Sequence, residues 1–218
     1  MPDFTPAPDQ LARKARSEAI LRAEGVPVLD SLPVIETDIL SNPRSKEEVA
    51  RRAMCLTFVA LKGEGMPGEE VEELVGDHKL REFLSPDESE FIFDLEADEE
   101  ERQAYTWRYE ALHVLLWALG YVTPLGRPRQ LCDVPNEIVF LHDLGPDDFI
   151  ERAVLRPASD ILDEADLIYR THWATRNASL QGQEPPAGLD EDVVMEWHHA
   201  LNWLCRTGED WDDISTDT

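Results

Sequence analysis

The apolar residues of this chain recur at helical spacing, and they are densest in its C-terminal half. Three apolar segments there, residues 107–119, 161–174 and 193–205, contain five of the six tryptophans. Large aromatic side chains bury much surface and contribute strongly to a core. The pattern therefore predicts a Trp-rich core in the C-terminal half, built from three helices.

Start and stop signals divide the whole chain into helices. Ser45 with Glu48 forms a capping box, and Ser85, followed by Pro86 and Glu88, starts another helix. Glycine, proline and apolar spacing then predict helices at residues 9–24, 45–62, 68–75, 85–95, 98–119, 136–143, 146–155, 159–180 and 190–206. Residues 26–43, which contain three prolines, read as an extended connector lying over the core.

No β-hairpin signal, βαβ alternation or internal repeat stands out in the sequence. The predicted fold is therefore all-α, a single compact domain of about seven to nine helices that spans residues 1–218. Within it, an N-terminal helical part, about residues 9–95, is expected to pack on a C-terminal core, about residues 98–218.

The charge of the chain narrows the range of partners. There are 46 acidic and 20 basic residues, a formal charge of −26, and the acids are dense at residues 94–101 and after Thr207. Such a field repels phosphate backbones, so we expect no nucleic-acid partner. A basic protein partner fits this charge, and a merely soluble, well-solvated surface is the alternative.

The sequence also indicates a cytoplasmic protein. Its longest apolar run, residues 114–119, is far shorter than the ~20 residues that a membrane span needs, and its N-terminus has no apolar signal core. Cys55, Cys132 and Cys205 are widely spaced, which favours reduced thiols over a disulfide framework.

One motif resembles a nucleotide-binding fingerprint and is better explained otherwise. Residues 63–68 spell Gly-x-Gly-x-x-Gly. A dinucleotide site needs a preceding strand and free backbone N–H groups, whereas here a helix precedes, Pro67 removes one donor, and Glu64 adds a negative charge. We interpret the segment as a linker that ends a helix.

A metal site was the sharper possibility. Glu110 with His113 and Glu196 with His199 are Glu-x-x-His pairs on two long helices, and residues 163–166 place acids on a third. Carboxylate-bridged di-iron bundles use such pairs, but they draw ligands from four helices. A helical wheel also places both pairs away from the apolar stripes. We therefore expect polar pairs at the surface or at the edge of the core, with no metal and no cofactor.

The two most informative of the remaining candidate functional residues are Arg108 and His172, which both lie on apolar helix faces. His172 is expected to be a neutral, hydrogen-bonded core residue, with a catalytic base as the alternative. Arg108 is expected to be mostly buried and paired with Asp163, Asp166 or an acid of the C-terminal tail, or else to bind an anionic ligand. The candidate ligand-binding set is Arg108, Asp163, Asp166, Arg170, His172, Glu196 and His198.

The acidic tail carries two apolar residues, Trp211 and Ile214, three positions apart. Burial of both side chains is worth roughly 3–5 kcal/mol, enough to offset the ordering of a few residues. We therefore predict that Trp211 is buried against the last two long helices.

A string of motifs spread over nearly the whole chain resembles a bacterial family, domain of unknown function 4272. The resemblance rests on Gly25-Val26-Pro27, Arg44-Ser45, Trp107-Arg108-Tyr109-Glu110-Ala111-Leu112, Leu115-Leu116-Trp117-Ala118-Leu119-Gly120, Cys132-Asp133, Ile161-Leu162-Asp163-Glu164-Ala165-Asp166-Leu167-Ile168-Tyr169-Arg170, His172-Trp173-Ala174, Ala200-Leu201-Asn202-Trp203-Leu204, Asp210-Trp211-Asp212 and Thr216-Asp217-Thr218. It implies a soluble bacterial protein and assigns no catalytic residue. Where the family has Glu-Arg-His ahead of Ala-Leu-Asn-Trp, this chain has Glu196-Trp197-His198, which removes a positive charge from any site built there.

Two classes of function follow from the sequence. The first is a non-enzymatic binding or regulatory protein, such as an acidic inhibitor of a basic toxin. The second is an enzyme, or a binder of a ligand or metal, that uses a polar pocket around Arg108, Asp163, Asp166, Arg170 and His172.

Overall fold

The computed structural model of the protein describes residues 5–37 and 42–218. Within these residues the chain forms nine α-helices, one short 3₁₀ helix and no strand, so the predicted all-α class is confirmed. The helices are α1 (Pro8–Ala23), α2 (Lys46–Glu64), α3 (Gly68–Asp77), α4 (Pro86–Phe93), α5 (Glu99–Thr106), α6 (Arg108–Ala118), α7 (Val134–Arg152), α8 (Ala158–Leu180) and α9 (Glu191–Leu204), with the 3₁₀ helix η1 (Pro186–Gly188) before α9.

Local signals set several of these boundaries as predicted. The hydroxyl groups of Ser45 and Ser85 each accept a hydrogen bond from the backbone N–H three residues on, which starts α2 and α4. Gly65, with φ 111°, ends α2 in a conformation that favours glycine. Gly63 has a packing role, because a Cβ there would lie 2.7 Å from the carbonyl oxygen of Arg102 on α5. The glycine-rich motif therefore ends one helix and lets another cross it closely.

The prediction of one long helix over residues 98–119 is wrong. The segment forms two helices, α5 and α6, that meet at Trp107 (φ −61°, ψ −18°). Nothing in the sequence marks the break, since neither glycine nor proline is present. The two helices have different surroundings: α5 packs on α2, whereas α6 packs on α2 and on α9. Gly145 (φ 69°, ψ 171°) interrupts α7, at the position where the sequence predicts a division into two helices.

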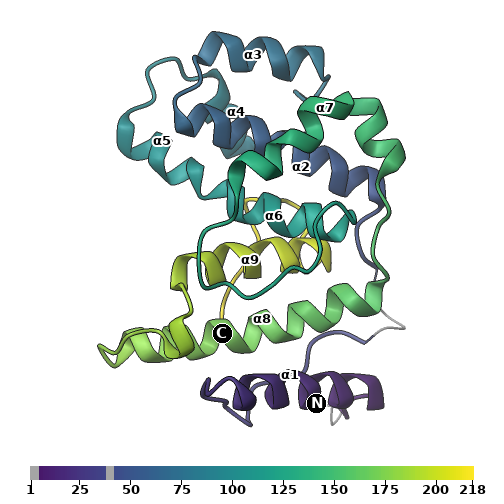
Figure 1. The fold of residues 1–218 in the computed structure, drawn as a ribbon, viewed down its shortest axis with the longest axis vertical. Helices are drawn as coiled ribbons and strands as arrows, with labels where there is room; N and C mark the ends of the chain where they lie inside the picture. Colours follow the sequence, from purple (N-terminus) through teal and green to yellow (C-terminus); the bar gives the residue numbers. More distant parts are fainter. Residues whose placement is uncertain (1–4, 38–41) are drawn as a thin grey trace.

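The helices form a stack along the long axis of the molecule (Figure 1). Each helix contacts the next along the series α1, α8, α9, α6 and α2. Helices α3, α5 and α7 pack on α2, and α4 packs on α3 and on α2. The N-terminal helix α1 therefore lies at the opposite end from α3. Residues 26–37 of the connector run beside α1, where Lys14 Nζ donates hydrogen bonds to the carbonyls of Asp30 and Leu32. Residues 38–41 of the connector lie outside the described residues.

The main core occupies the middle of the stack. Four tryptophans are buried in it, Trp117, Trp197, Trp203 and Trp211, together with the apolar face of α2. Nine of the eleven residues of α6 are buried, so this helix has almost no solvent-facing side. A second, smaller apolar cluster joins α1 to α8 and includes Leu21, Leu167 and Trp173. None of the helices in the described residues is both long enough and apolar enough to cross a membrane.

Candidate functional sites

Arg108 pairs with Glu196, not with the acids that the sequence suggested. Its Nη1 donates to Oε1 and Oε2 of Glu196 at 2.8 and 3.0 Å, which joins α6 to α9. The Glu196 side chain is 7% exposed and that of Arg108 is 26% exposed, so the arginine is less buried than expected. Burial raises the pKa of Glu196, and the neighbouring Arg108 partly offsets this rise. The expected pairing with Asp163, Asp166 or the tail is therefore corrected.

His172 and His198 face each other across α8 and α9. Their Nδ1 atoms lie 2.8 Å apart, and Asn202 Nδ2 lies 3.0 Å from His198 Nε2. Because the amide nitrogen donates, His198 Nε2 accepts, His198 Nδ1 carries the proton, and His172 Nδ1 receives that hydrogen bond. Burial lowers the pKa of His172 to about 4 and that of His198 to about 3. His172 is a buried, hydrogen-bonded residue of the interior.

The other members of the predicted set lie in two separate groups of ion pairs. Arg170 and Asp166 form a bidentate, fully buried pair on α8, with distances of 2.9 and 2.7 Å, and Arg170 Nη2 also donates to the carbonyl of Pro33. Asp163 is half exposed and accepts hydrogen bonds from Arg13 and Arg16 of α1. These contacts hold α8 to the connector and to α1.

The seven predicted ligand residues thus fall into four contacts at different places along α6, α8 and α9. Three of those contacts were unforeseen, namely Arg108 with Glu196, His172 with His198, and Asp163 with the two arginines of α1. The pair of Asp166 with Arg170 has the i, i+4 spacing that favours an ion pair on one helix. Of the seven, Asp163 alone lines any of five cavities in the described residues, and that cavity is an open cleft beside residues 123–127. Their binding of a ligand stays a prediction.

The two Glu-x-x-His pairs are not surface pairs, which corrects the helical-wheel expectation. Glu110 and Glu196 are 2% and 5% exposed. Glu110 accepts hydrogen bonds from the backbone N–H of Cys132 and from Trp197 Nε1. Within residues 5–37 and 42–218, no group of three or more His, Cys, Asp or Glu side chains is arranged to hold a metal ion. Both glutamates instead accept hydrogen bonds that link α6 to α9.

The acidic tail docks, as the two apolar residues predicted. Trp211 is 3% exposed and Ile214 is 8% exposed. The indole of Trp211 packs on His199 and Trp203 of α9, and the Arg52 guanidinium of α2 lies 5.3 Å from its ring centroid. The tail is therefore held between α9 and α2, whereas the prediction named the last two long helices, α8 and α9.

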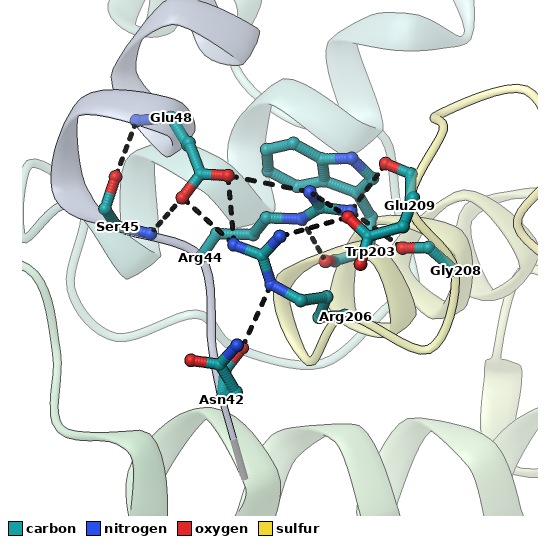
Figure 2. Close-up of polar contacts among 8 residues, drawn as sticks. All are labelled: Asn42, Arg44, Ser45, Glu48, Trp203, Arg206, Gly208 and Glu209. Carbon is teal, nitrogen blue, oxygen red and sulfur yellow. Dashed lines mark hydrogen bonds and ion pairs between the residues drawn. The ribbon is translucent and has the colours of Figure 1, made fainter.

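An arginine that sequence reasoning did not select holds the tail in place. Arg44 is buried, and its guanidinium donates to the backbone carbonyls of Trp203, Gly208 and Glu209 at 3.2, 2.7 and 2.7 Å (Figure 2). Arg206, also drawn in Figure 2, donates to Glu48 of α2 and to Glu209. We call these side chains, Arg44, Glu48, Arg206 and Glu209, the arginine clasp, because they join the start of α2 to the end of α9.

A large, mainly apolar cavity lies at the end of the stack far from α1, where α2, α3 and α7 meet. It has a volume of about 580 Å³, within the range of roughly 300–1,000 Å³ that is usual for binding sites. Its walls are Thr57, Phe58, Leu61, Met66, Glu70, Leu74, His78, Pro135, Ile138, Val139, Leu141 and Gly145. We call this cavity the α3–α7 groove. The lining is mainly apolar and contains no lysine or arginine.

The α3 wall of this groove is acidic at its edge. Leu74 and Glu70 line the cavity from the same face of α3, and Glu70, Glu73 and Asp77 are exposed. On the opposite wall Val139 of α7 is 38% exposed although it is a large apolar residue. The groove therefore combines an uncovered apolar floor with a negatively charged rim.

A family model for a domain of unknown function (DUF4272) matches residues 13–214 of the chain. The protein belongs to the DUF4272 family. Comparisons with curated proteins and with solved structures give no match.

The DUF4272 match begins within α1 and ends at Ile214 in the docked tail. It therefore includes the arginine clasp, the histidine pair and both walls of the α3–α7 groove. The groove had no signal in the sequence. Its lining combines α2 and α3, which are consecutive, with α7, which lies about sixty residues further along the chain, and most of its positions are ordinary apolar ones.

Proposed function

We propose that this DUF4272 protein is a non-enzymatic binding protein that docks a basic amphipathic helix of a partner protein in the α3–α7 groove. The observation that carries the proposal is the groove itself, an apolar cavity of about 580 Å³ whose edge is acidic and whose lining has no lysine or arginine. An amphipathic helix binds such a groove by placing its apolar face against the floor.

The charge of the surrounding surface selects a basic partner. Residues 64–101, which include α3, α4 and the start of α5, contain sixteen acidic and two basic residues, a net charge of −14 out of −26. Twelve of those acids are exposed. These helices lie at the same end of the molecule as α7 (Figure 1). A cationic partner is therefore attracted to the end that carries the groove, and an acidic one is repelled.

The proposal is tested with a fluorescently labelled amphipathic peptide of leucine and lysine. Two comparison peptides isolate its properties: one has glutamate in place of lysine, and one has the same composition in an order without an apolar stripe. We expect fluorescence anisotropy to show saturable binding of the first peptide alone. Binding should weaken with added salt, since exposed charges are screened.

Matched variants locate the binding. Val139→Asp places a negative charge in the groove. Val154→Asp introduces the same charge at another exposed valine, which does not line the groove. We expect the Val139 variant to bind at least about tenfold more weakly, because an apolar anchor is lost, and the Val154 variant to bind like the wild type. Equal binding of both variants would place the peptide elsewhere and overturn the groove. Equal binding of the leucine–glutamate peptide would overturn the basic partner.

A further inference from the structure

A second cavity, of about 280 Å³, lies where the start of α2, residues 82–86, the end of α9 and the tail converge. Its walls include Arg51, Arg52, Phe83, Ser85, Trp203 and Trp211. We call it the tryptophan pocket. It is separate from the α3–α7 groove, with which it shares no lining residue. Its volume is close to the lower end of the range of small-molecule sites.

Two of the three arginines in this pocket already have partners. The Arg44 guanidinium donates hydrogen bonds to the backbone carbonyls of Gly208 and Glu209. Arg52 forms an ion pair with the buried carboxylate of Glu88. Arg51 differs from both. Its guanidinium stacks 4.6 Å from the centroid of Phe83, and in the described part of the chain no carboxylate lies within ion-pair distance of it. Arg51 is therefore available to a ligand's carboxylate.

Buried donors stand beside it without partners. Trp211 Nε1 and Arg52 Nε have no hydrogen-bond partner in the described residues, although Trp211 is 3% exposed and the Arg52 side chain is 10% exposed. A buried N–H without a partner destabilises the folded protein, so an acceptor that reached either nitrogen, each of which has almost no exposed surface, would recover stability. The positive charge and the N–H donors of the pocket thus favour a ligand group that has oxygen acceptors and a negative charge.

The remaining charges of the pocket are negative. Glu82 and Asp210 line it, are exposed, and form no ion pair within the described ranges. The chain as a whole carries −26 and repels a ligand with net negative charge. A ligand with one carboxylate and one ammonium group avoids this repulsion, because its net charge is zero and each half meets an opposite charge.

We propose that the tryptophan pocket binds a small zwitterion of the α-amino acid class. Its carboxylate lies on Arg51 and its ammonium group lies toward Glu82 and Asp210. Its side chain contacts the Phe83 and Trp203 rings. This site is independent of the peptide groove, so either proposal can fail without the other.

The experiment screens the standard L-amino acids one at a time for a saturable rise in melting temperature, followed by calorimetric titration of those that stabilise. A ligand that binds the folded protein alone raises its stability by mass action. We expect at least one amino acid with an apolar or aromatic side chain to bind. The corresponding amine without a carboxylate, and the N-acetylated amino acid without a charged amine, should bind at least about tenfold more weakly.

Arg51→Gln is the decisive variant, and Arg81→Gln is its matched control. Arg81 also stacks on a phenylalanine, Phe93, but does not line the pocket. We expect Arg51→Gln to weaken binding roughly tenfold to hundredfold and Arg81→Gln to leave it unchanged, with both variants melting like the wild type when no ligand is added. The proposal is overturned if no amino acid binds or if Arg51→Gln binds as tightly as the wild type. Equal affinity for the N-acetylated compound would overturn the zwitterion in favour of a plain carboxylate.

Discussion

His172 and His198 are joined through their Nδ1 atoms, 2.8 Å apart, so that one imidazole serves as donor and the other as acceptor in the interior between α8 and α9. This contact needs a neutral His172, whose Nδ1 accepts, and the contact with Asn202 needs a neutral His198, whose Nε2 accepts, because a doubly protonated ring has no acceptor nitrogen. His199, on the same helix as His198, also has its pKa lowered, to about 4, chiefly by burial and next by Arg108. Burial beside α9 thus lowers the pKa of three histidines, which favours their neutral form.

The first prediction is that the free energy of unfolding falls as the pH is lowered from 6.5 toward 4. In that window the unfolded chain protonates its histidines at their ordinary pKa of 6.5, whereas folded His172 and His198, with pKa values of about 4 and 3, stay neutral. Each such group contributes up to about 1.4 kcal/mol per pH unit. Above pH 6.5 both states are neutral and the contribution to the slope vanishes.

Urea unfolding at a series of pH values measures this slope. The raised pKa of Glu196 acts in the opposite direction, so the comparison that matters is between wild type and His198→Gln. We expect the variant's slope between pH 6.5 and 5 to be shallower by roughly 1 kcal/mol per pH unit. Parallel curves for the two proteins would show that His198 does not titrate as its burial requires.

The second prediction concerns the pair of Arg108 with Glu196. Arg108→Ala leaves a nearly fully buried carboxylate without its cation. Because Arg108 is partly exposed, we expect destabilisation of roughly 2–3 kcal/mol, less than the about 3–5 kcal/mol typical of a fully buried pair. Adding Glu196→Gln to Arg108→Ala should restore part of the loss, since a neutral amide is cheaper to bury. Denaturant unfolding of both variants gives the answer, and a double variant less stable than the single one would contradict it.

The third prediction concerns Trp211. Replacement by alanine removes a buried indole from between α9 and α2, and we expect a loss of roughly 3–5 kcal/mol. Removing residues 210–218 should also lower the melting temperature clearly, because Asn202 and the backbone N–H of Asp87 lose their partners in the tail as well. A truncated protein that melts like the full chain would mean that the tail adds nothing to the fold.

The fourth prediction concerns the arginine clasp. Arg44→Lys keeps the positive charge but loses the planar group that reaches three backbone carbonyls at once. We expect a loss of about 1–3 kcal/mol and faster hydrogen exchange at residues 206–216. Lys46→Arg, which makes the reverse exchange at a partly exposed position nearby, serves as the control. Unchanged exchange in the tail of the Arg44 variant would show that other contacts hold it.

The sequence predicts those features whose causes are local. Ser45 and Ser85 start helices because each side chain caps a backbone N–H three residues away, and Trp211 docks because an isolated indole gains by burial. The break at Trp107 was missed because it depends on where α5 and α6 find their partners, and no residue type encodes it.

The polar residues were misplaced for a related reason. A helical wheel assumes that a helix has one buried side and one side in water, but α6 is buried almost all round. Glu110 therefore lies in the interior even though it is opposite the densest apolar stripe. Which acid meets Arg108, and which histidine meets His172, depends on how α8 and α9 are placed, and the sequence does not specify that placement by any local pattern.

The central position of α6 also has a consequence for synthesis. This helix emerges from the ribosome before α7, α8 and α9, yet α9 is one of the helices that pack on it. A nascent chain therefore holds the apolar surface of α6 partly uncovered through the synthesis of roughly ninety further residues, at about 5–20 residues per second. During that interval of several seconds the growing chain depends on α2, on chaperones, or on both to keep this helix from self-association.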